Sequence, residues 1–385
     1  MAPVDRNIKF GQWLDLWLRG KKALAESTRE SYRETIDLYG KPGLGHMRLA
    51  DVREQHLERL YEAIGQINNL PEGEVPGELL RRLLAARAPS TKRELAKGEK
   101  RGRAQQRPLS AARIQRIHRV LSSALGTAHR QKRIAHNPAV HVELPKVRRV
   151  RPLVWTAARV AQWKDTGRVP GPVMVWTPAQ VGAFFDFIEE WGERLRTVFH
   201  LAGTRGLRRG EVVGAEWVNV DWEAGTLSLL ESDEEEGGTL KSEASWRTVA
   251  LDAVNVELLK AWRRQQRRER LAVGEAWVDS GRIFTRPDGS PLNPDRLSQR
   301  FGELVHISRL PPIRFHDLRH CAATLALAAG VDIKVISATL GHARHSFTAD
   351  VYVSVVPEVA TAAAEATTAI VPRRASTSPR RARRA

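Results

Sequence analysis

Cysteine, tyrosine and long apolar runs are scarce in this chain of 385 residues. One cysteine excludes an internal disulfide and any zinc module built on several cysteines, and it is typical of a reducing compartment. The longest apolar run, near residues 321–331, is about half of the roughly 20 residues that a helix needs to cross a bilayer. The first ten residues lack the apolar stretch of a secretory signal. We therefore expect a cytoplasmic protein without a membrane span.

Acidic residues are outnumbered: the chain has 62 Lys and Arg against 44 Asp and Glu, a formal net charge of +18. Strong positive charge favours polyanionic partners, nucleic acid first and an anionic membrane second. Since no span is visible, nucleic acid is the favoured partner. A length of this order predicts two or three domains, each able to bury its own core.

Residues 1–145 are expected to form a helical domain. Apolar residues between 10 and 18 fall at helical spacing, and the sequence STRE at 27–30 resembles a capping box opening a second helix. The sequence YGKPG at 39–43 predicts a break, followed by a third helix over 49–64. The aromatic stripe of the first helix is interpreted as core or as a contact to a neighbouring subunit, in preference to a surface that stacks on DNA.

A basic insertion is expected at about residues 65–108, because this stretch carries Pro71, Pro76 and Pro89 and the run KRELAKGEKRGRAQQR. Two interpretations stay open, a solvated loop and a strap across a DNA backbone. Residues 110–133 then predict a long helix, which His136-Asn137-Pro138 ends because proline cannot continue the hydrogen-bond ladder.

The second half of the chain predicts a mixed domain at 177–360, after a linker at 146–176 that is basic and rich in proline. Thr177-Pro178 is typical of an N-cap followed by proline at the first helical position. Two short strands are expected at 226–230 and 247–251, among helices that include a basic one at 258–270. The fold class is therefore mainly α with a small antiparallel β-sheet (α+β). Residues 361–385 are expected to hold the end of a C-terminal helix and a disordered tail with six arginines.

One tyrosine stands apart from the other three. Tyr352 is the only tyrosine beyond residue 61, and it follows the sequences HDLR at 316–319 and LGH at 340–342. Arginine holds phosphate through a planar, permanently charged fork, and histidine moves a proton near neutral pH. A lone phenol behind such groups favours a covalent nucleophile that acts on a phosphodiester.

Six short motifs occur in a fixed order along the second half of the chain. They are the sequence GLRRGE at 206–211 with Arg208, Lys241 between the two expected strands, the sequence RTV at 247–249, His316 and Arg319 in the His-x-x-Arg box, His342 in the Leu-Gly-His box, and Tyr352. Together they resemble the tyrosine recombinase (phage integrase) family, over about residues 177–357. The helical N-terminal part looks like the core-binding domain of that family.

The resemblance implies a role for each of these residues. Tyr352 would attack the scissile phosphate and form a 3′-phosphotyrosine, with His316 as the base. Arg208 and Arg319 would clamp the non-bridging oxygens, Lys241 would protonate the departing 5′-oxygen, and His342 would hydrogen-bond the phosphate. Rejoining would need neither ATP nor metal, so no cofactor is expected.

Four neighbours of these residues are expected to have structural rather than catalytic roles. Glu211 is expected to be a buried brace for an arginine, Asp317 a capping or bracing residue, and Cys321 a small buried residue on a helix. His320 is expected to be structural or solvent-facing.

The family further implies double-stranded DNA as the partner, a homotetramer on that DNA, and a nucleoid-associated enzyme with a possible accessory DNA-bending or excision factor. The long chain favours an integrase of a phage or integrative element, and its Ala/Arg-rich composition an actinobacterial source. A Xer-like resolvase, a transposon recombinase and a type IB topoisomerase share the chemistry and stay open, as does a non-catalytic DNA-binding protein.

A metal site is the last alternative. His316 and His320 stand at i and i+4, as in a zinc-binding helix. Asp317 occupies the position of the general base, Arg319 would place its charge towards the metal, and no third ligand is evident. We expect no metal.

Overall fold

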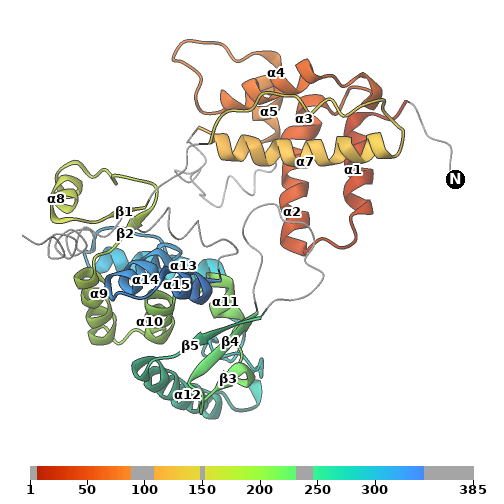
Figure 1. Cartoon of the computed structure of the whole chain (residues 1–385). Helices are drawn as coiled ribbons and strands as arrows, with labels where there is room; N and C mark the ends of the chain where they lie inside the picture. Colours follow the sequence, from red (N-terminus) through yellow and green to blue (C-terminus); the bar gives the residue numbers. More distant parts are fainter. Residues whose placement is uncertain (1–6, 88–107, 148–151, 231–245, 342–385) are drawn as a thin grey trace, which may run out of the picture. The chain divides into compact units, whose positions relative to one another are not determined.

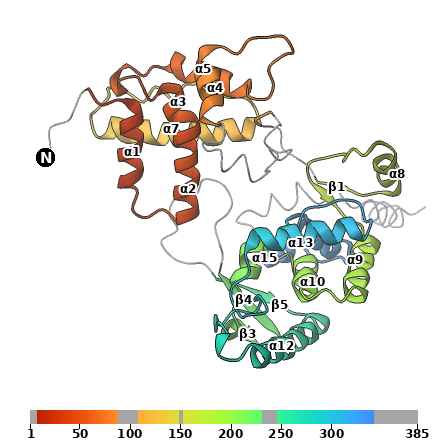
Figure 2. The same cartoon turned by 180° about the vertical axis from the view of Figure 1, so that it is seen from behind.

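The computed structural model describes residues 7–87, 108–147, 152–230 and 246–341. The chain divides into two compact units, Met1–Arg149 and Val150–Ala385. The described part of the first unit is built from helices, whereas the second combines helices with short strands (Figures 1 and 2). None of the helices in the described residues has the length and apolarity that crossing a bilayer requires.

The first unit is a helical bundle around one apolar core. Its elements are α1 (Phe10–Gly20), α2 (Glu26–Thr35), a π-helical turn (Ile36–Gly40), α3 (Lys41–Leu44), a 3-10 turn (Leu49–Asp51), α4 (Glu54–Gly65), α5 (Glu78–Ala86) and α7 (Ala111–Arg130). The aromatic stripe of α1 is core, because the Trp13 indole donates to the Ala124 carbonyl at 3.1 Å and the Trp17 indole to Thr127 Oγ1 at 3.2 Å. α1 is thereby fixed against α7.

Two expectations for the first unit were wrong. α2 begins at Glu26 with Ala25 as its N-cap, so the sequence 27–30 lies inside the helix. The sequence 39–43 does not interrupt the helical structure, because the π-helical turn runs directly into α3. Pro42 lies in the first turn of α3, where no N–H partner is needed. Gly40 serves close packing, since a Cβ there would lie 2.8 Å from Leu14 Cδ1.

The expected insertion at 65–108 is partly folded. α5 lies within it and buries Leu80 and Leu83 in the core of the first unit. Apolar residues at helical spacing thus outweigh the surrounding prolines and charges. Residues 88–107 lie outside the described residues, and whether they form a loop or a strap stays open.

The prediction that residues 146–176 form a linker was also wrong for most of this segment, which is folded. Strand β1 (Leu153–Val154) pairs in parallel with β2 (Met174–Val175), and α8 (Ala157–Thr166) connects them. Trp155 and Trp176 are fully buried, and their indoles donate to the carbonyls of Pro312 at 3.1 Å and Pro311 at 2.8 Å. Two large aromatic side chains therefore make this segment part of the second core despite its proline-rich composition.

The remainder of the second unit has a helical part and a sheet part. Its further elements are α9 (Pro178–Glu190), α10 (Arg196–Arg205), α11 (Arg209–Gly214), β3 (Val220–Asp221), β4 (Thr226–Leu230), β5 (Trp246–Ala250), α12 (Ala253–Val273), α13 (Pro294–Ile307), α14 (Asp317–Ala328) and α15 (Ile333–Leu340). The antiparallel sheet has the order β3-β4-β5. In both views this sheet and α12 lie together, and α9, α10, α13 and α15 form the other part of the unit (Figures 1 and 2), in which Figure 1 also shows α14.

Several sequence predictions for this unit are confirmed. Thr177 caps α9: its side chain accepts from the Gln180 N–H, and its own N–H donates to Gln180 Oε1 at 2.9 Å. The two expected strands are β4 and β5, which pair antiparallel. The fold class, mainly α with a small antiparallel sheet, is confirmed, and the parallel pair β1-β2 is an addition to it.

Candidate active site

The site begins at the turn between α10 and α11. Gly206 ends α10 with φ +68°, a left-handed conformation that favours glycine, and a Cβ there would lie 2.4 Å from Leu340 Cδ2. Arg208 follows as the N-cap of α11. Its N–H donates to Glu211 Oε2 at 2.7 Å, and its guanidinium donates to Glu211 Oε1 at 3.0 Å. This local geometry explains the glycine, arginine and glutamate of the sequence GLRRGE.

Glu211 also receives a second arginine. Arg247 of β5 donates from Nε to Oε1 at 3.1 Å and from NH2 to Oε2 at 2.6 Å. Burial raises the pKa of the Glu211 carboxyl, but Arg247 and Arg208 outweigh it and hold that pKa below its usual value. The expected role of Glu211 as a brace is confirmed, and the carboxylate braces two arginines rather than one.

Arg247 received no role from the sequence, although a signal for it existed. In an antiparallel strand alternate residues share a face, and Arg247 is buried together with Val249, at 7% and 0% exposure. An arginine at an inward strand position needs a buried partner. Glu211, at 4% exposure, supplies it.

The start of α14 brings the next residues. Arg319 is 2% exposed and donates to the Gly206 carbonyl at 2.9 Å. His316 is the N-cap of this helix, and the Asp317 carboxylate accepts from the Arg314 guanidinium at 2.7 Å and 3.0 Å. The bracing role expected for Asp317 is thereby confirmed.

His320 packs edge-to-face against His316, with ring centroids 5.7 Å apart. Burial, followed by the neighbouring His316, lowers the pKa of His320 to about 4. His320 is therefore neutral near pH 7 and adds no charge beside His316. The expected structural role fits this position.

The end of α15 is where the arginines converge. Arg247 donates to the Thr339 carbonyl, Arg319 to the Leu340 carbonyl, and Arg208 to the Gly341 carbonyl at 3.0 Å. These are consecutive carbonyls at the negative end of a helix, which attracts cations. Three guanidinium groups from three separate elements thus meet at the end of α15, and two of them, Arg208 and Arg247, also pair with Glu211.

The charge balance of this cluster favours an anion. Within the described residues, the buried arginines Arg208 and Arg247 share the carboxylate of Glu211, and the carboxylate of Asp317 is paired with Arg314. The buried guanidinium of Arg319 donates to the carbonyls of Gly206 and Leu340. Arginine offers five N–H donors, so Arg208 and Arg319 can bind phosphate oxygens in addition to carbonyls.

The structure brings together only part of the predicted set. Arg208 and Arg319 meet, and His316 lies at the N-terminus of the helix that carries Arg319. Lys241, His342 and Tyr352 lie outside the described residues, although His342 follows Gly341 directly in sequence. Their roles stay predictions.

Cys321 is not a nucleophile of this site. Burial raises the pKa of the Cys321 thiol to about 12, so the thiolate is not populated near neutral pH, and its sulfur accepts from the Trp176 N–H at 3.4 Å. The expected buried role of Cys321 is confirmed. No three His, Cys, Asp or Glu side chains of the described segments group as metal ligands.

Comparison with known proteins gives the family. The sequence model of the phage integrase family matches residues 175–358, and the model of the phage integrase N-terminal SAM-like domain matches residues 9–64. The two segments cover more than half of the chain and contain all the predicted site residues. The chain belongs to the tyrosine recombinase (phage integrase) family.

Among curated relatives, a XerC-like tyrosine recombinase of Caldanaerobacter subterraneus is 31% identical over 191 residues, which are 45% of this chain and 49% of that protein. The ICEBs1 integrase of Bacillus subtilis is 28% identical over 192 residues, 47% of this chain and 50% of that protein. The chain therefore spans about half the length of these relatives.

Solved structures show the same fold at low sequence identity. The Tn1549 transposon integrase in complex with a circular intermediate DNA has a TM-score of 0.60 at 16% identity, over 94% of this chain and 99% of that one. A lambda integrase tetramer bound to a Holliday junction has a TM-score of 0.56 at 16% identity, over 91% of this chain and 78% of that one. The mixed fold of helices and a small sheet is thus that of known integrases.

Proposed function

We propose that the protein is a site-specific DNA recombinase that cuts and rejoins DNA through a 3′-phosphotyrosine, and so integrates or excises a mobile element. The observation that carries this proposal is the meeting of Arg208 and Arg319 at the end of α15, directly before His342. Membership of the tyrosine recombinase family supports it.

In the proposed first step, the Tyr352 oxygen bonds to phosphorus while the bond from phosphorus to the 5′-oxygen breaks. A phenol has a pKa of about 10, so His316 takes its proton. Lys241 gives a proton to the departing 5′-oxygen. Arg208 and Arg319 stabilise the negative charge that grows on the two non-bridging oxygens.

The second step reverses the first with a different strand. A 5′-hydroxyl attacks the phosphotyrosine, and the Tyr352 oxygen leaves and regains its proton. The number of phosphodiester bonds is conserved, so the chain's own residues suffice for rejoining.

The proposed partner is double-stranded DNA, bound by a homotetramer in the nucleoid, with a possible accessory bending or excision factor. Solved structures of the same fold contain DNA, and one is a tetramer on a Holliday junction. We place the helical DNA-binding domain in the unit Met1–Arg149 and the catalytic domain in the unit Val150–Ala385. A Xer-like resolvase is the second candidate, because a XerC-like recombinase is among the relatives.

A suicide substrate tests the proposal. A nicked duplex carrying the candidate attachment core, taken from DNA beside the gene, should trap a covalent protein–DNA adduct that withstands denaturing gels. Tyr352→Phe should form no adduct and keep its affinity for the duplex within a few fold, because only the nucleophilic oxygen is removed. Excess chelator should leave the adduct unchanged.

Each failure has its own meaning. Adduct formed by Tyr352→Phe would show that another residue is the nucleophile. Tight binding of the duplex by the unsubstituted protein with no adduct on any substrate would favour a non-catalytic DNA-binding protein. Loss of adduct in chelator would favour metal-dependent cleavage.

A further inference from the structure

A second positively charged site lies in the second unit, beside α12. It is a cavity of about 240 Å³ that shares no residue with the candidate active site. Its lining includes Trp217, Arg263, Arg267, Arg270, Trp277 and Arg282. On this measure one water needs roughly 10–15 Å³, so the cavity has room for a phosphate with part of an attached ring.

The arginines of this cavity have little compensating charge. The one lining carboxylate, Asp279, pairs with Arg270 at 3.2 Å in a largely exposed contact. Arg263 lies over the rings of Trp217 and Trp222, at 5.2 and 5.7 Å. Within the described residues neither Arg263 nor Arg267 has a carboxylate partner. Concave walls concentrate such unneutralised charge, and arginine forks match phosphate oxygens.

The helix dipole does not account for these arginines. Cations are favoured only within the last turn of a helix. α12 ends at Val273, and Arg263 lies more than two turns before that end. The dipole therefore accounts for a cation at Arg270 but not for the arginines Arg263 and Arg267.

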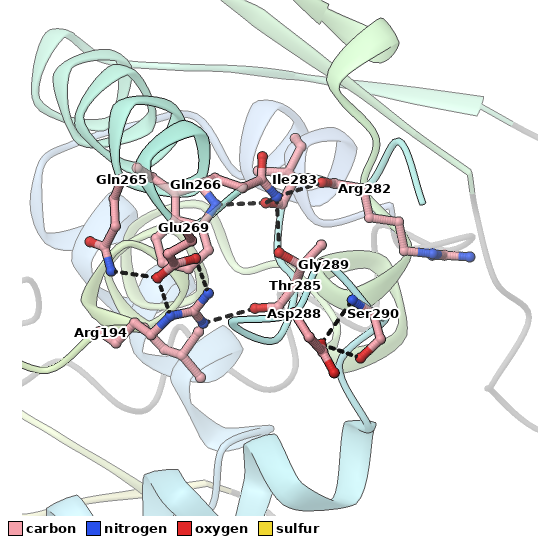
Figure 3. A network of polar contacts seen from close by, with 12 residues as sticks. Arg194, Gln265, Gln266, Glu269, Arg282, Ile283, Thr285, Asp288, Gly289 and Ser290 are labelled. Atoms are coloured by element: carbon pink, nitrogen blue, oxygen red, sulfur yellow. Dashed lines mark hydrogen bonds and ion pairs between the residues drawn. The ribbon is translucent and has the colours of Figure 1, made fainter. Parts of the chain in front are cut away.

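The walls of the cavity are held by a network of hydrogen bonds. The Trp217 indole donates to Gln266 Oε1 at 2.7 Å. Gln266 Nε2 donates to the carbonyls of Arg282 and Ile283, both at 3.1 Å, and to Thr285 Oγ1 at 3.0 Å (Figure 3). α12 and the segment 282–285 are thereby fixed to each other before any ligand binds.

Trp277 is fixed by a glycine. Gly289 has φ +83°, and a Cβ there would lie 2.5 Å from the indole of Trp277. The missing side chain lets the ring lie against the backbone of the turn, and Trp277 also lines the cavity. An aromatic face held in place beside cationic side chains is a stacking surface for a nucleobase.

We propose that this cavity binds a nucleotide, either free or within a DNA strand. The phosphate lies between Arg263 and Arg267, and the base stacks on Trp277. The site is independent of the recombination chemistry, so it stands or fails separately from the proposed function.

Tryptophan indole signals in nuclear magnetic resonance spectra of the full chain provide a local readout. Trp217→Phe and Trp277→Phe assign the two signals, and dAMP, deoxyadenosine and inorganic phosphate are titrated in turn at low salt. We expect both signals to shift with dAMP, and more weakly with phosphate or deoxyadenosine alone. Unmoved signals at millimolar dAMP overturn the proposal, whatever the active-site arginines bind.

Neighbouring arginine pairs on α12 give a matched control. Arg263→Gln/Arg267→Gln and Arg264→Gln/Arg268→Gln remove the same charge from the same helix, each at i and i+4, and only the first pair lines the cavity. We expect the first variant to weaken dAMP binding at least about tenfold, since it removes two charge-assisted hydrogen bonds to phosphate, and the second to stay within about twofold. Equal weakening by both variants would show a general electrostatic effect and overturn the site.

Two further measurements keep the test decisive. Arg267→Glu changes an exposed side chain that does not stack on the indoles, so it should abolish binding without a change in melting temperature. A single-stranded oligonucleotide that shifts the same two signals identifies DNA as the source of the nucleotide, and shifts with dAMP alone identify a free nucleotide. Normal dAMP binding by folded Arg267→Glu contradicts the proposal.

Discussion

Replacing Arg247 with alanine should destabilise the second unit more than replacing Arg208, although both arginines pair with Glu211. The Glu211 side chain is fully buried and accepts four hydrogen bonds, two from Arg208 and two from Arg247. Arg208→Ala removes one of these four, since the backbone N–H remains, and also the hydrogen bond to the Gly341 carbonyl. Arg247→Ala removes two and also deprives the Thr339 carbonyl of its donor.

The expected sizes follow from these hydrogen bonds. Removing one partner of a buried ion pair costs about 3–5 kcal/mol, and one net hydrogen bond to a charged group about 1.5–3 kcal/mol. For a unit of this size, 1 kcal/mol shifts the melting temperature by about 2–4 °C. Arg247→Ala should therefore lower the melting temperature of the second unit by about 6–20 °C, and Arg208→Ala by clearly less.

Calorimetry of the full chain measures these shifts, and hydrogen exchange in peptides from β5 and α15 assigns them to the second unit. The melting temperature of Arg247→Lys should lie between those of the unsubstituted protein and Arg247→Ala, because lysine keeps the charge but cannot form the two parallel hydrogen bonds of a guanidinium. The double variant Arg247→Ala/Glu211→Gln should cost at least about 2 kcal/mol less than the sum of the single variants, because both remove the same pair. A coupling energy near zero between Arg247 and Glu211 would refute the inference that Arg247 is the main partner of Glu211. Equal shifts in melting temperature for Arg208→Ala and Arg247→Ala would refute it too.

Three further results are expected. Arg208→Ala or Arg319→Ala should slow adduct formation on the suicide substrate by about 10²–10³-fold. Lysine at either position should restore little of that rate. A near-normal rate for Arg208→Lys would mean that charge alone matters at this position. The pKa of His320, about 4, lies below its ordinary value of 6.5, so its contribution to stability is complete above pH 6.5 and is lost as the pH falls towards 4. His320→Gln should reduce the pH dependence of the free energy of unfolding in that range by up to about 3 kcal/mol. An unchanged pH dependence would contradict the neutral state of His320. Deleting residues 373–385 removes six arginines. The slope of log affinity against log salt should fall by about 0.9 for each phosphate that the tail no longer neutralises, and by the same amount on cognate and scrambled duplexes. Weaker binding confined to cognate DNA would refute a purely electrostatic role of the tail.

Short sequence patterns correctly predicted those helices and strands whose ends depend only on neighbouring residues. Thr177-Pro178 fixed the start of α9 because a cap and a first-turn proline act within one turn of the helix. The strands β4 and β5 were visible because their alternating pattern is a property of the strand itself. Arg208 and Arg319 were assigned by resemblance, and the structure brings them together.

The errors arose where tertiary contacts decide the outcome. The segment around Trp155 has the composition of a linker, but its indole is paired with a carbonyl more than 150 residues away. Gly40 and Pro42 suggested a break, and close packing against Leu14 kept the helix continuous. Arg247 was seen only as part of a strand motif, since nothing near it in sequence reveals that Glu211 is its partner.

The convergence of arginines on the end of α15 has a consequence for the protein while it is being made. Arg208, Arg247 and Arg319 are brought to carbonyls 339–341, and the predicted nucleophile lies beyond these carbonyls in sequence. Contacts across such long stretches form late, because the entropy of closing the loops opposes them until the core is in place. A chain still emerging from the ribosome therefore cannot assemble this cluster. Under the proposed function, the order of the residues along the gene would delay DNA cutting until the domain is complete.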